Sequence, residues 1–313
     1  MAWTLSTSLD DFRAQAGGFL AAHPAENTVL LSVADRLATD GPAAYGEEPP
    51  RFGWWRPGAG GPVEGAYLQT PPYNPRLGLM PAVAAAELAG AFVEAGAPGA
   101  GAPGVGAPGA GAFEVRAPGA GVSAVGRALD GISGGKAAVR AFAAAWCAAT
   151  GRRSTVRVDE LLHRLVELVP PGPAPAGLAR AARTAERELL IGWFEDFGAE
   201  VAVDFHTSPD AVDRRIADGT LHVWEDGGRP VSFAGRSPVV AGMSRIGPVF
   251  TPPGLRGRGY AGAVTAAASA YALAQGAAEV LLYTDLANPT SNSIYRKLGY
   301  RPVEDCLAVT FHG

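Results

Sequence analysis

The sequence is poor in the residues that build metal centres and disulfide frameworks. Its 313 residues include 2 cysteines, 3 methionines and 5 histidines. Cys147 and Cys306 lie far apart in apolar surroundings, so we expect neither a disulfide framework nor a metal site. This cysteine usage fits a reducing cytoplasm, which is the location we expect.

Charge and long apolar runs are also scarce. Charged residues make up 18% of the chain, and 26 basic against 30 acidic residues give a net charge of -4 without a long block of one sign. This balance predicts no nucleic-acid partner. No apolar run approaches the roughly 20 residues that a membrane helix needs, and Asp10 and Asp11 occupy the place of a basic signal-peptide start. We therefore expect no membrane partner, and the composition gives no indication of oligomeric state.

Glycine and proline, by contrast, are abundant, with 42 and 26 copies. Many lie in residues 97–121, where APGAG-type pentapeptides repeat with one irregular unit, AFEVR. Pro and Gly multiply unfolded conformers and Ala offers little to bury, so the repeat predicts a disordered or elastin-like surface loop. Collagen is excluded because Gly does not recur at every third position.

A second proline-rich stretch, residues 170–175, predicts an extended linker. The chain is longer than one hydrophobic core usually grows, so we expect two domains, residues 1–170 and 171–313. In the first, the apolar spacing predicts helices at 23–37, 80–92 and 136–149 and strands at 63–68 and 155–161. The repeat then interrupts a connection in an α/β domain.

The second domain shows a clearer alternation of elements. A helix follows Thr184, with Leu189, Leu190, Trp193, Phe194 and Phe197 on one face, and Ser208-Pro209 starts another. We expect a hairpin over 221–234, a strand at 243–250, an Ala-rich helix to about residue 275, a strand at 280–284, a helix at 291–298 and a final hairpin at 300–311.

The segment from Arg256 to Ala261 lies between the expected strand and the Ala-rich helix. Its glycines allow close backbone approach, free N–H groups at the helix start favour an anion, and Arg256 and Arg258 add positive charge. A pyrophosphate would fit, although a tight turn with two solvated arginines explains this hexapeptide equally well. Gly257, Gly259 and Gly262 also satisfy the dinucleotide-binding G-x-G-x-x-G pattern. Residues 251–256 separate them from the strand, and too little chain follows to complete that sheet, so this alternative is weaker.

Two blocks together resemble the GNAT (Gcn5-related N-acetyltransferase) superfamily. Arg256, Gly259 and Ala261 match its Arg/Gln-x-x-Gly-x-Gly/Ala loop. Asn288, Ser291 and Tyr295 resemble its Asn-x-x-Ala-x-x-x-Tyr-x-Lys-x-Gly-Phe block, with Ser in place of Ala and Tyr300 in place of Phe. The resemblance covers the second domain, and the similar element order of the first suggests a degenerate copy without the phosphate loop.

The resemblance implies a mixed central sheet flanked by helices, in two tandem GNAT-like domains, and an N-acetyltransferase that uses acetyl-CoA. The acceptor would be an amine of a small molecule or peptide that attacks the thioester directly. The residues implied in cofactor binding are Val249, Phe250, Thr251, Arg256, Gly257, Arg258, Gly259, Tyr260, Ala261, Gly262, Asn288 and Ser291. Gly247-Pro248 supports the site independently, because a proline inside a central strand marks a bulge or a break in pairing.

The chemistry implied by the resemblance gives Tyr295 the role of the acid that protonates the departing thiolate. Without the family context, packing beside Leu298 would explain Tyr295 better, and Asn288 before Pro289 is also an ordinary helix N-cap. The general base is not identifiable among Asp285, Glu225, His222 and a water chain. A non-catalytic acyl-CoA-binding regulatory module and a dinucleotide-dependent oxidoreductase are the competing functions.

Overall fold

The computed structural model describes residues 2–96, 129–201 and 208–313. The repeat at 97–121 lies outside these residues, so the prediction made for it stays a prediction. Two compact units make up the chain: unit 1 contains Met1–Asp159 with Asp305–Gly313, and unit 2 contains Glu160–Glu304. The boundary expected at 170/171 lies inside unit 2, and the extent of each independent domain remains a prediction.

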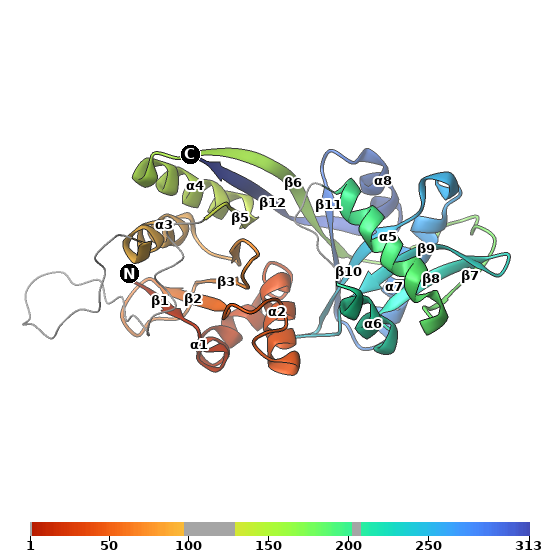
Figure 1. The fold of residues 1–313 in the computed structure, drawn as a ribbon, viewed down its shortest axis with the longest axis horizontal. Helices are drawn as coiled ribbons and strands as arrows, with labels where there is room; N and C mark the ends of the chain where they lie inside the picture. Colours follow the sequence, from red (N-terminus) through yellow and green to blue (C-terminus); the bar gives the residue numbers. More distant parts are fainter. Residues whose placement is uncertain (1, 97–128, 202–207) are drawn as a thin grey trace, which may run out of the picture. The chain divides into compact units, whose positions relative to one another are not determined.

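Unit 1 forms a mixed sheet with a pair of helices on each face. Its elements are β1 (Ala2–Ser6), α1 (Leu9–Ala22), α2 (Thr28–Asp40), β2 (Arg51–Arg56), β3 (Gly65–Gln69), β4 (Arg76–Leu77), α3 (Ala82–Gly96), β5 (Gly131–Gly135), α4 (Lys136–Thr150) and the start of β6 (Arg153–Leu165). Phe12 of α1 stacks on Phe52 of β2, with ring centroids 4.9 Å apart. On the other face, Phe92 and Phe142 of α3 and α4 build the main core. The pairs α1–α2 and α3–α4 are visible in Figure 1.

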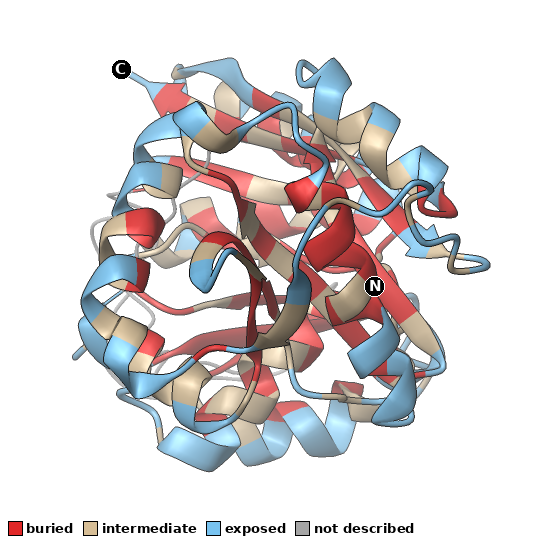
Figure 2. Ribbon diagram, turned by 90° about the vertical axis from the view of Figure 1, so that its right-hand side faces the viewer, coloured by how far each residue is buried: buried red, intermediate tan, exposed pale blue. Residues whose placement is uncertain are grey.

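Unit 2 repeats the same order of elements. They are β7 (Leu178–Ala181), α5 (Arg187–Glu200), α6 (Pro209–Ala217), β8 (Leu221–Asp226), β9 (Arg229–Arg236), β10 (Met243–Phe250), α7 (Tyr260–Ala274), β11 (Glu279–Asp285), α8 (Pro289–Lys297) and the start of β12 (Tyr300–His312). The core between the sheet and α5 contains Trp193, Phe194 and Phe233. The core on the opposite face joins α7 to Tyr295 and Leu298. Buried residues follow the strands and inner helix faces in Figure 2.

The two sheets also share their pattern of pairing. In unit 1 the strand order is β1-β2-β3-β4-β5-β12, and in unit 2 it is β7-β8-β9-β10-β11-β6. Among the strands that the structure describes, only the fourth and fifth of each sheet pair in parallel. This repeated order and pairing of strands confirms the expected α/β fold with two GNAT-like units in tandem.

The last strand of each sheet comes from the other half of the sequence. The end of β6 pairs with β11, with Thr284 opposite Leu161, and the end of β12 pairs with β5, with Ala308 opposite Ser133. The hairpin expected at 300–311 is therefore wrong. Pro302 and Glu304-Asp305 suggest a turn, but alternate side chains such as Val309 and Phe311 are buried, which is the period of one continuous strand.

In unit 1 the parallel strands β4 and β5 lie close together. Its β4–β5 pairing brings Leu77 so close to Gly134 that a Cβ atom on the glycine would lie 2.7 Å from the Cβ of Leu77. The chain between β4 and α3 is Gly78-Leu79-Met80-Pro81, without the Arg-x-x-Gly-x-Gly/Ala pattern. None of the helices that the structure describes is long and apolar enough to cross a bilayer.

Candidate active site

In unit 2 the corresponding parallel strands separate. Residues Met243–Arg245 of β10 pair with Glu279–Leu281 of β11, whereas β10 continues to Phe250 and β11 to Asp285. On its other edge β10 shifts register against β9 between Ile246 and Val249. Pro248 lies at this shift and has no N–H to donate, so the irregularity expected there is confirmed.

The chain after β10 turns through glycines into α7. Gly257 has φ 78° and Gly259, the N-cap of α7, has φ 86°, a left-handed conformation that strains other residues. No side chain of the described residues caps this helix. The amides of its first turn, at Tyr260, Ala261 and Gly262, have no acceptor within the helix and are suited to an anion.

The two arginines of this loop have different surroundings. Nε of Arg256 donates to the Thr251 carbonyl at 2.8 Å, and its Nη2 lies 2.7 Å from both carboxylate oxygens of Glu200. Its guanidinium also lies 5.7 Å from the Phe250 ring centroid. Arg256 therefore braces the loop against α5, while Arg258 is exposed on the loop surface.

The end of β10 is held firmly on one edge. Val249 pairs with Ala234 and Phe250 with Phe233 of β9, and the Ser232 hydroxyl donates to the Phe250 carbonyl at 2.8 Å. The Thr251 hydroxyl lies 2.8 Å from that of Ser232. The opposite edge of β10 faces the separation from β11, where an extended amide ligand would find main-chain partners.

The separated part of β11 carries an orphaned hydroxyl. Thr284 is 4% exposed, and in the part of the chain that the structure describes its Oγ1 has no hydrogen-bond partner. Strand alternation places it on the same face as Val280 and Leu282, which pack with α7. An unsatisfied buried hydroxyl costs about 1–3 kcal/mol, and a polar ligand between the strands would remove that cost. These features fit a cofactor with an anionic group and an amide-containing arm.

Asn288 and Ser291 lie at the start of α8. The Asn288 Oδ1 accepts from the Ser291 amide at 3.0 Å and Pro289 occupies the first turn, so the capping interpretation is confirmed. Asn288 is exposed, which leaves a cofactor contact open beside its capping role.

Tyr295 lies on the side of α8 that packs against the core shared with α7. Its ring meets that of Tyr300 edge-on, at 6.1 Å between centroids and 68° between planes. Burial raises the pKa of Tyr295 to about 12, so the hydroxyl keeps its proton at neutral pH. Among the hydrogen bonds of the described residues none involves this hydroxyl, so packing and proton donation are compatible.

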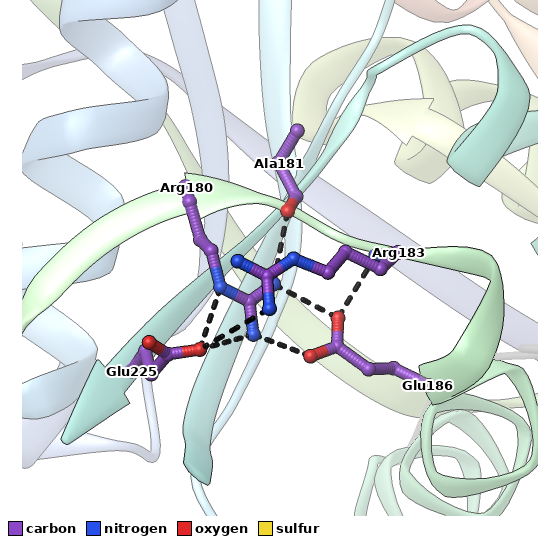
Figure 3. Close-up of polar contacts among 5 residues, drawn as sticks. All are labelled: Arg180, Ala181, Arg183, Glu186 and Glu225. Atoms are coloured by element: carbon purple, nitrogen blue, oxygen red, sulfur yellow. Dashed lines mark hydrogen bonds and ion pairs between the residues drawn. The ribbon is translucent and has the colours of Figure 1, made fainter. Parts of the chain in front are cut away.

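The first candidate base, Glu225, belongs to an ion-pair cluster on β7 and β8. Nε of Arg180 donates to Oε2 of Glu225 at 2.7 Å, and Arg180 also binds both carboxylate oxygens of Glu186. Figure 3 shows the two carboxylates on either side of the Arg180 guanidinium, with Arg183 alongside. Burial tends to raise the pKa of Glu186, but hydrogen bonds from Arg180 and the Arg183 amide outweigh it and lower that pKa. Glu225 is thus part of a structural cluster.

His222, the second candidate, is 1% exposed and stacks on Tyr271, with centroids 4.5 Å apart. Nε of Arg236 donates to its Nε2 at 3.2 Å, which assigns the ring proton to Nδ1. Burial and the nearby Arg236 charge lower the pKa of His222 to about 4, so it is neutral. Tyr271 lies near the C-terminal end of α7, remote from the glycine loop at the N-terminal end.

Of the three candidate bases, Asp285 is the one in the part of β11 that no longer pairs with β10. Its Oδ1 accepts from the Ala287 amide at 2.8 Å. Strand alternation places Asp285 on the face opposite Thr284. Tyr295 packs with the core on the Thr284 side, so Asp285 and Tyr295 lie on opposite faces of β11.

The model of the acetyltransferase (GNAT) family matches residues 187–300, which include the separated strands, the glycine loop and α8. This part of the chain belongs to the GNAT family. The chain thus carries an acetyltransferase domain, and its second unit is named the GNAT unit below. No curated protein matches the chain.

Solved structures extend the likeness in fold to the whole chain. A GNAT-family acetyltransferase from Colwellia psychrerythraea is 13% identical over 99% of both chains, with a TM-score of 0.55. A Drosophila protein is 10% identical over 97% of both chains, with a TM-score of 0.61. A GCN5-related glucosamine N-acetyltransferase region of a fungal multi-domain enzyme is 12% identical, with a TM-score of 0.52. The match covers 99% of this chain and 38% of the fungal chain. At these identities the likeness concerns the fold.

Three features of the GNAT unit were missed from the sequence. Glu200 is the partner of Arg256, Thr284 is the orphaned hydroxyl, and Pro171 and Pro175 lie beside Gly262 and Gly259. Thr284 had a detectable signal, because a polar residue at a buried position of an apolar strand needs a partner. The other two depend on tertiary contacts between distant segments.

Proposed function

We propose that the protein is an N-acetyltransferase that moves the acetyl group of acetyl-CoA to an amine. The observation that carries this proposal is the uncapped start of α7 directly after the bulged end of β10, inside the segment that matches the GNAT family. Residues 251–259 connect a strand end that does not pair with β11 to this uncapped helix start. This arrangement is suited to a ligand with a pyrophosphate and a peptide-like arm.

Acetyl-CoA would be held by main-chain groups of this unit. The amides of residues 257–262 and the Arg258 side chain would bind the pyrophosphate, with Arg256 bracing the loop. Residues 249–251 would pair with the pantetheine arm. Asn288 and Ser291 would contribute at the start of α8.

In the reaction, the nitrogen of a neutral amine attacks the thioester carbonyl carbon. A C–N bond forms, the C–S bond breaks, and its electron pair goes to sulfur. The Tyr295 hydroxyl donates to this sulfur as the acid of the step, and the proton lost by the amine goes to a base on the other face of the split. Asp285 occupies that face, and a small-molecule or peptide amine is the acceptor.

The test is CoA release from acetyl-CoA across a library of small primary amines and peptides with free amino groups. CoA release that depends on one acceptor class supports the proposal. Acetyl-CoA binding without release for any amine contradicts it and favours the regulatory module. Binding of NAD in place of acetyl-CoA would favour the oxidoreductase.

The role of Asp285 is tested with Asp285→Asn. Asparagine keeps the oxygen that accepts from the Ala287 amide but cannot take a proton. We expect kcat to fall by about 100-fold, within the range of general base catalysis, with unchanged acetyl-CoA affinity. An unchanged kcat would show that water, rather than Asp285, accepts the proton lost by the amine.

A further inference from the structure

Residues 169–176, named the proline strap here, lie against the glycine loop of the GNAT unit. A Cβ atom on Gly259 would lie 3.7 Å from Cβ of Pro175, and one on Gly262 would lie 3.6 Å from Cγ of Pro171. The same point at Gly262 is 3.5 Å from Cγ2 of Ile294 on α8. Pro171 and Pro175 are partly buried, whereas Pro170 and Pro173 are exposed.

The strap is fixed at both of its ends. The Val169 amide donates to the Leu298 carbonyl at 3.0 Å, just after α8. At the other end, Nε1 of Trp224 donates to the Ala176 carbonyl at 2.8 Å. Gly177 follows with φ 106°, and a Cβ atom there would overlap the Glu225 carbonyl oxygen. The two proline rings are therefore held in place beside the start of α7.

We propose that Pro171 and Pro175 of the proline strap form a wall of the acyl-CoA site and contact the nucleotide half of the cofactor. This inference rests on the proposed function. Gly259 and Gly262 bracket the amides expected to bind the pyrophosphate, so Pro171 and Pro175 lie beside the place where a group attached to that pyrophosphate would be held. The rings of these prolines and Ile294 form an apolar surface suited to a ribose and a purine.

The strap lies beside the anion-binding amides without hydrogen bonding to them. Prolines have no N–H to donate, and their rings contact the Cα sides of the glycines. Among the hydrogen bonds of the described residues none runs from the amides of residues 260–262 to the strap. The anion-binding donors therefore remain available, and removal of the rings weakens binding rather than relieving a block.

The experiment compares Pro171→Ala, Pro175→Ala and the double variant with Pro170→Ala, the same change at an exposed position of the segment. Calorimetry measures Kd for acetyl-CoA and for acetyl-4′-phosphopantetheine, which lacks the nucleotide. We expect each variant at Pro171 or Pro175 to bind acetyl-CoA about fivefold more weakly, with Pro170→Ala unchanged. The affinity for acetyl-4′-phosphopantetheine stays as in the wild type.

Each other outcome overturns a specific claim. Wild-type protein that does not bind acetyl-CoA contradicts the proposed function, whatever the variants do. Equal acetyl-CoA affinity of all variants removes the strap from the site. Tighter binding by the Pro171 and Pro175 variants shows an obstructing strap, and equal weakening for both ligands shows a general disturbance of α7. The single variants keep the test valid if the double variant does not fold.

Discussion

Tyr295→Phe is the change that separates catalysis from packing most cleanly. Phenylalanine keeps the ring that meets Tyr300 edge-on, and the hydroxyl that it removes takes part in none of the hydrogen bonds of the described residues. The melting temperature and the acetyl-CoA affinity should therefore stay close to those of the wild type.

The expected loss of turnover can be worked from the tyrosine's pKa. Burial raises that pKa to about 12, whereas an ordinary thiol titrates near ~8.5. Complete proton transfer to the thiolate would then be uphill by about 3.5 pKa units, or roughly 5 kcal/mol. The main contribution of Tyr295 to the transition state is therefore a hydrogen bond to the developing thiolate, which is worth about 1.5–3 kcal/mol for a charged partner. We expect kcat to fall by about 10- to 150-fold.

The assay is CoA release at saturating acetyl-CoA with a working acceptor, next to a binding measurement on the same protein. Unchanged kcat with unchanged binding would refute the argument and leave Tyr295 as a core aromatic. A matching loss of binding and turnover would show that the ring positions the cofactor.

Three further outcomes are expected. Acetyl-CoA should raise the melting temperature because it binds the folded state, and Gly259→Val should abolish this shift by straining the left-handed N-cap. Gly254→Ala, whose added Cβ atom meets no atom within 4 Å, should keep the shift. A normal shift in the valine variant would show that the cofactor site is not at this loop. Deletion of residues 97–121 should preserve one cooperative unfolding transition, since loop closure depends weakly on length, and aggregation of the shortened protein would make the repeat structural. The lowered pKa of Glu186 stabilises the fold above the unfolded-state pKa near ~4.3, and this stabilisation is lost as pH falls through the lower folded-state pKa. Unfolding of Glu186→Gln between pH 7 and 3 should thus depend less on pH, and an unchanged slope would remove Glu186 from acid sensitivity.

The sequence predicted unit 2 well because Gly and Pro mark its element ends. Pro209 lies in the first turn of α6 as expected, Gly227 and Gly228 turn the hairpin, and Gly299 with φ 99° ends the α8 segment. The prediction of the buried face of α5 was partly wrong, since Leu189 is 41% exposed while Leu190 is buried. A period of 3.6 identifies a face but does not fix its width.

Unit 1 was harder because its strands lack the usual composition. β5 reads Gly-Ile-Ser-Gly-Gly, which has low strand propensity, yet Gly134 is required where Leu77 packs against it. β4 has only two residues, too few to show a period. β5 lies between β4 and β12, both far from it in the sequence, and the short β4 is held between β3 and β5.

At the site, the motifs predicted which segments meet but not what each side chain does there. The pairing of Arg256 with Glu200, the burial of His222 and the raised pKa of Tyr295 all arise from packing that no local pattern contains. Prolines at 170–175 favour an extended chain, whereas the structure bends this segment at Gly172 and Pro173 and places Pro171 and Pro175 beside Gly262 and Gly259.

The exchange of last strands has a consequence for synthesis of the protein. The edge of β5 that faces β12 is paired only when residues 306–310 have been translated, long after β5 itself. Until then a ribosome-bound first unit carries an open sheet edge, which is a site for association with other chains. The Gly-rich sequence of β5 limits that risk, because it offers few apolar side chains to a wrong partner. Loss of residues from 305 onward would accordingly damage the unit made first.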